Sequence, residues 1–466
     1  MHGTKVFAMA LFVGVVLAAS GCGMLAAEPT AEYSWQKAHA RVTPEGDLQW
    51  APRPFVFEAG DSVRYIDFEG GDDERAGTSP GTAWKHHPWD ADATGNAAAC
   101  EGVHTYVFKR GVVYRGSLVA DESGEPGNPI RLTSDPSWGS GEACIHGAVR
   151  IAGGWQKLDA ENAPASMPDP QNVWFMYTDA SFTPTAMWEV HDGAITRIQL
   201  AREPDWEVSD PDDVKSEWYE WEDVTKEAVG PDGEKEAKAW GIDTEHLTAT
   251  DPNAYEGATV WSEYAGVMGT PYANAVEAYD PERHAIRFAG PWGDASSRAP
   301  ILHCRYYLDN HPRFLDQPGE YYYTTVQGGN VGALYVRLPE DRNPNESLIE
   351  AASELTLLDV RNQSHIHVTG LTFRFQNVAH WYDRWWTIAE EDPACVKALG
   401  TCSDIRVANC RFEHTVRAIY AQPGGDAFMD DIAFTDNEIA HSDYGPIHVS
   451  RGGGELQRVK VLRNRL

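Results

Sequence analysis

Apolar residues return at a fixed spacing in the last part of the chain. The pair Ile405 and Val407 recurs 27 residues later at positions 432 and 434, and after the same step at 459 and 461. Within each copy apolar and polar residues alternate, as in a strand that buries one face. A fixed repeat of this length is typical of stacked repeat proteins. We therefore predict one short strand per repeat, about 4.8 Å from its neighbours, in a parallel β-solenoid. An ordinary β-sandwich with accidental spacing is the alternative.

One polar position follows the same repeat. Asn437 and Asn464 are also 27 residues apart, and a side-chain amide at such a position can bond to the copies above and below. Cys410 takes this position in the preceding copy, which predicts a buried free thiol. A less regular copy surrounds Ile366, 39 residues before Ile405. An insertion between positions 380 and 400 accounts for this longer step.

Changes in the pattern divide the chain. The middle part alternates short strand-like runs with Pro- and Gly-rich connections, which indicates an inserted antiparallel β-rich module. Because the last copy stops partway at Leu466, we expect the natural protein to continue beyond it. The predicted segments are a signal peptide (1–27), a lead-in (28–64), a cap with the first solenoid strands (65–154), the insert with an acidic loop (155–338) and the repeats (339–466).

The N-terminus has the features of an export signal. Lys5 precedes an apolar run over residues 6–19, which is short for a membrane span and suited to a signal peptide. The following Ala-Ser-Gly-Cys22 is similar to the lipobox of bacterial lipoproteins. We expect Cys22 to be lipidated and to tether an exported chain to the membrane, with plain secretion after Ala26 or Ala27 as the alternative.

Six cysteines remain after Cys22, and an even number in an exported protein permits disulfides. Cys395 and Cys402 are close enough in sequence to close a loop, and Cys100 with Cys144 is a second plausible pair. Their spacing does not suggest a zinc site. We therefore predict disulfides and no zinc.

The chain of 466 residues has a net charge of −32, which argues against nucleic acid and anionic membranes as partners. We expect a monomer. Part of the excess charge lies between positions 203 and 236, where carboxylates are mixed with Trp206, Trp218 and Trp221. A solvated loop explains this run; calcium is a possible ligand because it prefers clustered oxygens, although no ordered EF-hand spacing is present.

Two stretches carry a family resemblance. The segment from Tyr65 to Lys85, with a strand, a Gly-Thr-rich turn and a Trp, resembles the opening of secreted right-handed parallel β-helix proteins of the pectate-lyase-like superfamily. Leu200-Ala-Arg-Glu-Pro-Asp205 is similar to the Ala-Arg-Tyr-Pro-Asn element of β-helix glycoside hydrolases with an inserted β-rich module. The resemblance implies an all-β right-handed parallel β-helix and a polysaccharide as partner. Since Glu203 and Asp205 replace the Tyr and Asn, we expect a structural role for them.

The repeat allows side chains of successive copies to be superposed. It places His414 on His441, Arg417 on Tyr444, position 416 on Asp443 and position 421 on His448. Such a cluster of titratable groups is a candidate active site, but stacked ladders are also ordinary β-helix packing, and simple alternation would point His441 to the interior. The predicted catalytic residues are Asp443, His441, Arg451, His414 and Arg417. The predicted substrate-binding residues are Trp381, Trp385, Trp386, Tyr444 and His448.

Three functions fit these residues. A glycoside hydrolase needs two carboxylates at the scissile bond, and Asp443 is the first choice because histidines adjoin it. A polysaccharide lyase needs a base and a cation that neutralises a uronate carboxylate, for which His441, Arg417 and Arg451 are available. A non-catalytic surface lipoprotein that binds glycan is the third. A charge of −32 would repel a polyuronate, so the sequence favours the hydrolase.

Overall fold

The computed structural model describes residues 41–44, 46, 48–226, 238–263, 271–289, 302–377 and 392–466. The chain divides into two compact units, residues 1–49 and 50–466. In the first unit, β1 (Arg41–Val42) and β2 (Leu48–Gln49) form a small antiparallel sheet. All other described elements belong to the second unit. No helix among the described residues has the length and apolar character needed to cross a membrane.

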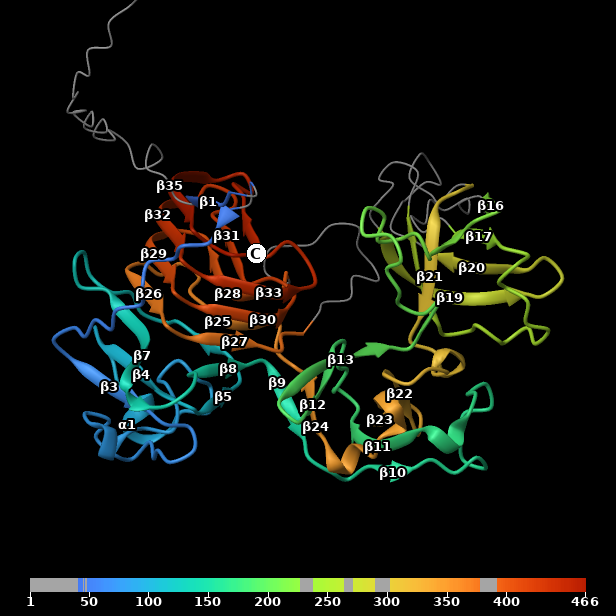
Figure 1. Cartoon of the computed structure of the whole chain (residues 1–466), viewed down its shortest axis with the longest axis horizontal. Helices are drawn as coiled ribbons and strands as arrows, with labels where there is room; N and C mark the ends of the chain where they lie inside the picture. The colour runs from blue at the N-terminus through green and yellow to red at the C-terminus, as the bar shows by residue number, and fades with distance from the viewer. Residues whose placement is uncertain are drawn as a thin grey trace, which may run out of the picture. The chain divides into compact units, whose positions relative to one another are not determined.

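Three parallel sheets hold the strands at both ends of the second unit (Figure 1). From β25 onward the chain visits the third, first and second sheets in turn and repeats this circuit to β35. This confirms the predicted all-β fold with stacked parallel strands. The first sheet contains β3 (Val63–Ile66), β4 (Thr105–Arg110), β7 (Ile130–Gly139), β26 (Ile366–Thr369), β29 (Cys402–Ala408), β32 (Phe428–Thr435) and β35 (Glu455–Leu462). The second contains β5 (Val113–Arg115), β8 (Cys144–His146), β27 (Thr372–Arg374), β30 (Arg411–Thr415) and β33 (Glu438–Ser442). The third contains β6 (Leu118–Val119), β25 (Thr356–Asp359), β28 (Ala394–Leu399), β31 (Ile419–Gln422) and β34 (Ile447–Val449).

The register of these strands follows the sequence repeat. Ile405 pairs with Ile432, and Ile432 with Val459, so the alternating apolar side chains stack in the core. The Phe373 and Phe412 rings of consecutive copies are also stacked, with centroids 5.0 Å apart. Burial of matched apolar side chains in successive strands is what stabilises this region, which we call the repeat region (residues 356–466).

The repeated Asn position forms the predicted ladder. The Asn437 side chain is fully buried; its Oδ1 accepts from the backbone N–H of Cys410 at 2.9 Å, and its Nδ2 donates to Asn464 Oδ1 at 2.9 Å and to the Val407 carbonyl at 3.0 Å. Cys410 is buried and free, as its place in the repeat predicts.

The predicted disulfides are wrong, because all six described cysteines are free thiols. Cys395 lies in β28 and Cys402 in β29, which belong to different sheets, and their sulfurs contact different groups. Closeness in sequence therefore does not bring the two side chains together. Cys100 lies beside the Tyr106 hydroxyl, whereas Cys144 lies beside Arg374.

Two mainly antiparallel sheets lie between the early and late parallel strands in the sequence. The first has the order β10-β11-β23-β22-β13-β12-β24-β9, in which only β13 and β22 run parallel; the second has the order β14-β21-β18-β19-β20-β17-β16, with β15 on β21. Their cores are separate clusters from that of the parallel strands. The strands of the first are β9 (Ala148–Ile151), β10 (Gln156–Lys157), β11 (Trp174–Asp179), β12 (Met187–His191), β13 (Ala194–Leu200), β22 (Glu320–Val326), β23 (Val331–Arg337) and β24 (Leu348–Ala352). Those of the second are β14 (Arg202–Glu203), β15 (Tyr219–Glu220), β16 (Asp223–Lys226), β17 (Lys238–Ile242), β18 (Thr259–Glu263), β19 (Pro271–Asp280), β20 (Ala285–Ala289) and β21 (Arg305–Asp309).

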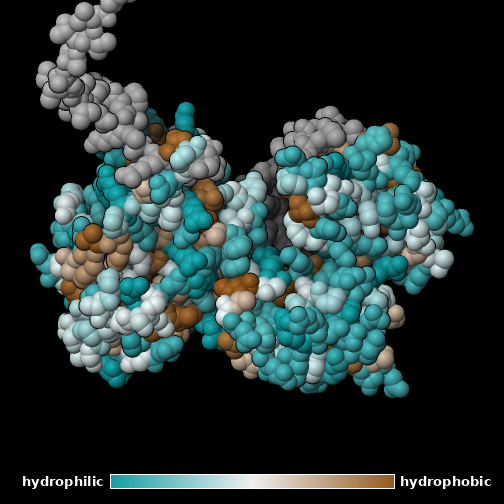
Figure 2. Space-filling model, in the orientation of Figure 1, coloured by the Kyte–Doolittle hydropathy of each residue, from teal (hydrophilic) through white to brown (hydrophobic). Residues whose placement is uncertain are grey.

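Helices are few and short among the described residues. They are α1 (Gly95–Ala98) and single 3₁₀ turns at Pro80–Thr82, Pro170–Asn172, Pro312–Phe314, Pro339–Asp341 and Pro344–Glu346. The face of the molecule visible in Figure 2 is mostly hydrophilic, with scattered apolar spots, in keeping with the acidic composition.

Candidate functional site

The predicted stacking of His414 on His441 is present. The two rings are 4.6 Å apart and parallel within 2°, and Phe375 continues the column at 5.8 Å from His414. All three residues have left-handed backbone conformations, with φ between 53° and 58°. This conformation interrupts the alternation along the strand, so His441 is exposed and does not point to the interior. Burial and the neighbouring His441 lower the pKa of His414 to about 4, which leaves its ring neutral at neutral pH.

Asp443 lies next to this column. Its carboxylate is 3.1 Å from Arg197 Nη1, and the Arg197 guanidinium lies over the Trp188 ring of β12 at 4.8 Å. The predicted neighbour Tyr444 lies over the Arg417 guanidinium at 5.1 Å. Arg417 is only 2% exposed. The structure therefore pairs Asp443 with Arg197, whose neighbour Trp188 lies 6.1 Å from the His414 ring, and it buries Arg417 behind Tyr444.

The other predicted residues do not join this group. Arg451 donates to the Gly454 carbonyl at 3.1 Å within the turn after β34. His448 pairs with Tyr420 and not with position 421, because one extra residue precedes β34 and lengthens the step; this part of the superposition is wrong. The remaining predicted side chains, Trp381, Trp385, Trp386 and the lipidation site Cys22, lie outside the described residues.

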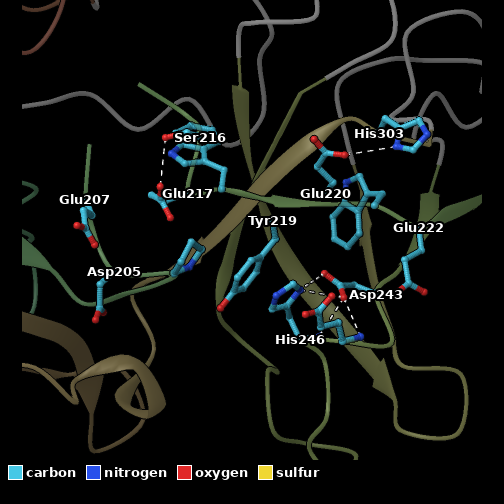
Figure 3. Close-up of a pocket in the computed structure, with 14 residues that line it drawn as sticks. Asp205, Glu207, Ser216, Glu217, Tyr219, Glu220, Glu222, Asp243, His246 and His303 are labelled. Carbon is cyan, nitrogen blue, oxygen red and sulfur yellow. Dashed lines mark hydrogen bonds and ion pairs between the residues drawn. The ribbon is translucent and has the colours of Figure 1, made fainter. Parts of the chain in front are cut away.

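A pocket separate from these residues lies in the insert (Figure 3). Its volume is about 720 Å³, within the usual range for ligand sites. Its residues come from the segment after β14, from β15 and the two residues that follow it, from the segment after β17, and from His303 before β21. We call it the insert pocket. It is lined by Pro204, Asp205, Glu207, Ser216, Glu217, Trp218, Tyr219, Glu220, Trp221, Glu222, Asp243, Glu245, His246 and His303.

Packed aromatic rings form one wall of this pocket. Trp221 is fully buried, stacks on Tyr306 at 3.5 Å and donates its indole N–H to Ser262. The Tyr306 hydroxyl donates to the buried Asp243 carboxylate at 2.7 Å, which also contacts His246 Nδ1 at 2.8 Å. His246 in turn stacks on Tyr219 at 3.7 Å. Because these rings stack on one another and share hydrogen bonds with Asp243, the pocket wall is formed without a ligand. Figure 3 shows the Asp243–His246 pair beside the Tyr219 ring.

A carboxylate cluster adjoins the insert pocket and shares Asp205 with it. Asp205, Asp316 and Glu320 present oxygen atoms that all lie within 4.8 Å of one another. Burial, with the nearby Asp205 charge, raises the pKa of Glu320 to about 8, so it keeps its proton at neutral pH. Burial also raises the pKa of Asp205 and of Asp316 above their ordinary values. Carboxyl groups with raised pKa values at such short range are a feature of catalytic sites.

This oxygen-only set is also of the kind that Ca²⁺ prefers, the one cofactor that the sequence left open. Calcium would have to displace the proton of Glu320, so its affinity would rise with pH. Glu320 and Asp316 lie more than 100 residues after Asp205 in the sequence, and nothing in the repeat pattern relates them. The sequence offered one sign of this cluster: in the Arg-Glu-Pro-Asp element, acidic residues replace the Tyr and Asn of the family element. We expected a structural role for them.

The fold is similar to that of a solved structure, although no protein-family model and no curated protein sequence matches this chain. The solved structure is named "Glycoside hydrolase". It matches with a TM-score of 0.50 and 13% sequence identity, over 81% of this chain and 67% of that chain. At this identity the similarity concerns the fold alone.

Proposed function

We propose that this protein is an exported glycoside hydrolase that cleaves an extracellular polysaccharide, built on a right-handed parallel β-helix with an inserted β-rich module. The observation that carries the reaction is the carboxylate cluster at the insert pocket, where Glu320 keeps a proton at neutral pH within 4.8 Å of Asp205 and Asp316. The circuit through three parallel sheets and the fold similarity to a glycoside hydrolase support the β-helix.

The cluster can perform acid and nucleophilic catalysis. Glu320 donates its proton to the leaving glycosidic oxygen as the C–O bond breaks, and the exposed Asp205 forms a bond to the sugar carbon. Water then attacks that carbon and releases Asp205, while Glu320 takes the proton of the water. A separation within 4.8 Å is close to the spacing of about 5–5.5 Å that retaining glycosidases use. Because Glu320 is 5% exposed, the leaving oxygen must enter the cluster to reach it. The Trp218 and Tyr219 rings line the pocket and offer apolar contacts to a sugar, although His246 already covers one face of Tyr219.

The insert pocket disfavours a lyase. Elimination requires a cation that neutralises the uronate carboxylate, and the residues that line this pocket include no Lys or Arg. The cations over the Trp218 ring are already engaged: Arg202 donates to the Pro204 carbonyl and Lys215 pairs with Glu263. Arg417 and Arg451, the cations predicted for a lyase, are buried behind Tyr444 and bound to a turn carbonyl, respectively. A hydrolase is therefore the better match to the described geometry.

The test is a depolymerisation screen on neutral, amine-bearing and uronate polysaccharides, with and without calcium. Reducing ends without the ultraviolet absorbance of an unsaturated uronate support hydrolysis. We expect Glu320→Gln to lower the rate at least about 100-fold, the usual contribution of a general acid. Asp192→Asn, at a 93%-exposed carboxylate in the turn between β12 and β13, is the matched control and should leave the rate unchanged.

Two results would overturn the assignment. Loss of activity in Asp443→Asn with full activity in Glu320→Gln would move the active site to the His414–His441 column. Silence on every glycan, with binding retained, would leave a glycan-binding surface protein. Circular dichroism and thermal melting of each variant separate loss of chemistry from loss of folding.

Export and lipidation belong to the same proposal. The apolar run over residues 6–19 and the Ala-Ser-Gly-Cys22 motif support an envelope lipoprotein. In bacteria fed a labelled fatty acid, we expect the full chain to incorporate the label and Cys22→Ser to lose it. Label in neither protein, with the protein in the medium, would indicate plain secretion.

A further inference from the structure

The insert pocket combines a cavity with an unusual charge pattern. Its lining contains seven carboxylates and two histidines but no Lys or Arg. Some carboxylates have partners: Glu222 accepts from Thr244, and Glu220 lies 3.4 Å from His303 and 3.8 Å from Arg305. Glu217 accepts from the Ser209 and Ser216 hydroxyls, and the buried Asp243 contacts Tyr306 and His246. By contrast, no ion pair among the described residues reaches the side chains of Asp205, Glu207 or Glu245, which are exposed.

Unpaired carboxylates in a concave site set up a negative potential that concentrates cations and repels anions. An oligosaccharide that carries uronates would meet this repulsion at every unit. A neutral one would gain only the ring and hydroxyl contacts. A sugar with protonated amines would gain the same contacts and also pair its charges with Glu207 and Glu245.

The pocket lining and its size fit a sugar better than a bare cation. Trp218 and Tyr219 line the pocket, and aromatic side chains offer a sugar ring apolar contacts that a metal ion would not use. The volume of about 720 Å³ has room for a short oligosaccharide.

We infer that the insert pocket selects saccharides with protonated amino groups, such as oligomers of glucosamine, over N-acylated and uronate oligomers. This inference rests on the proposed glycan-active function and names its substrate class. Glu207 and Glu245 provide the charge recognition, and Trp218 with Tyr219 provides the sugar contacts.

The test is isothermal titration calorimetry of the full chain with glucosamine hexamer, N-acetylglucosamine hexamer and an oligogalacturonate. We expect the glucosamine hexamer to bind at least about 10-fold more tightly than its N-acetylated counterpart, with a preference that weakens as salt is added. Oligogalacturonate should show no binding. Equal affinity for the two hexamers, or tighter binding of the oligogalacturonate, would overturn the inference.

A pair of double variants separates local charge from net charge. Glu207→Gln/Glu245→Gln should weaken glucosamine-hexamer binding at least about 10-fold and leave N-acetylglucosamine-hexamer binding unchanged. The control Glu256→Gln/Glu282→Gln removes the same charge at exposed positions outside the pocket lining and should change neither. Loss of the preference in the control would show a net-charge effect and overturn the inference.

Two further arms identify other occupants. Spermine or Ca²⁺ that binds while every oligosaccharide is silent would make the pocket a polyamine or metal site and contradict the inference. Hydrolysis that depends on Glu320 without any preference for amines would overturn this inference and leave the proposed function standing. A preference for amines without hydrolysis would overturn the proposed reaction and leave this inference standing.

Discussion

Carboxylates at stacked positions of the repeat region and carboxylates around the insert pocket differ in how they are paired. In the repeat region charges meet partners in a neighbouring copy: Arg463 contacts both oxygens of Asp436 at 2.5 and 2.7 Å, and Arg406 lies 3.2 Å from Asp431. Stacking places these partners 27 or 25 residues apart in sequence but side by side in space. In the insert, Asp205 and Glu207 have no ion pair within the described part of the chain.

The same difference appears in the pKa values. Burial alone would raise the pKa of Asp404 in β29, but hydrogen bonds from His367 and His365 hold it near 2. In the insert, burial raises the pKa of Glu320 to about 8 and that of Asp309 to about 7. In the repeat region Asp404 and Asp436 have compensating donors, whereas Glu320 and Asp309 of the insert are under-compensated. Reactive groups are therefore expected in the insert, while the repeat region provides support.

The largest expected effect on stability lies in the stacked core of the repeat region. Phe412→Ala removes a fully buried ring that stacks on Phe373, and should cost about 3–5 kcal/mol of unfolding free energy. Urea denaturation followed by fluorescence measures it. The control Phe428→Ala, at a residue 38% exposed in the neighbouring copy, should change little. Equal costs at the two positions would show that stacking is not what stabilises the repeats.

The Asn ladder should give the next largest effect. Asn437→Ala leaves the buried Cys410 N–H and Val407 carbonyl without their partner, which should cost about 2–3 kcal/mol. Asn464→Ala acts at a half-buried position in the last described copy and should cost less. The same denaturation experiment compares the two. A larger loss at Asn464 would contradict the assumption that burial sets the cost.

The two regions should also respond differently to pH. The folded pKa values of Glu320 and Asp309 lie above the ordinary values of 4.5 and 3.8. Their contribution to stability is therefore complete at low pH and is lost as the pH rises toward 7–8, by about 1.4 kcal/mol per pH unit for each carboxyl. Asp404 has a lowered pKa, so its contribution is present above pH 3.8 and is lost only as the pH falls toward 2.

Hydrogen exchange, corrected for the intrinsic pH dependence of the rate, measures this contrast. Between pH 5 and pH 8 we expect protection to fall in β14 and β21 of the insert and to hold in β29 and β32. Glu320→Gln should flatten the dependence in the insert. A uniform loss of protection in both regions would contradict the prediction.

The smallest effect is expected at Asp443. Its ion pair with Arg197 is partly exposed, and such pairs contribute less than about 1 kcal/mol. A double-mutant cycle of Asp443→Asn and Arg197→Gln measures the coupling energy. A coupling energy well above this value would contradict the prediction and would mean that the ion pair stabilises the contact between β13 and the turn after β33.

Much of the repeat region was predictable because its pattern is local and periodic. Ile405, Ile432 and Val459 indicate the strand register, and the spacing of His414 and His441 indicates their stacking. The 27-residue spacing predicted the wrong partner for His448, because the repeat is one residue longer there and His448 pairs with Tyr420. It also failed where left-handed residues interrupt the alternation, as at the exposed His441.

The carboxylate cluster was not predictable in this way. Asp205 and Glu320 are far apart in the sequence, and only the strand order of the two insert sheets brings them together. Their pKa values depend on burial, which no sequence pattern in the insert reports. The repeat and its all-β parallel strands follow from the sequence, because each copy specifies the next through identical spacing. The pocket, the free thiols of Cys395 and Cys402 and the candidate acid follow from tertiary structure, because distant segments create the burial and proximity that give these side chains their chemistry.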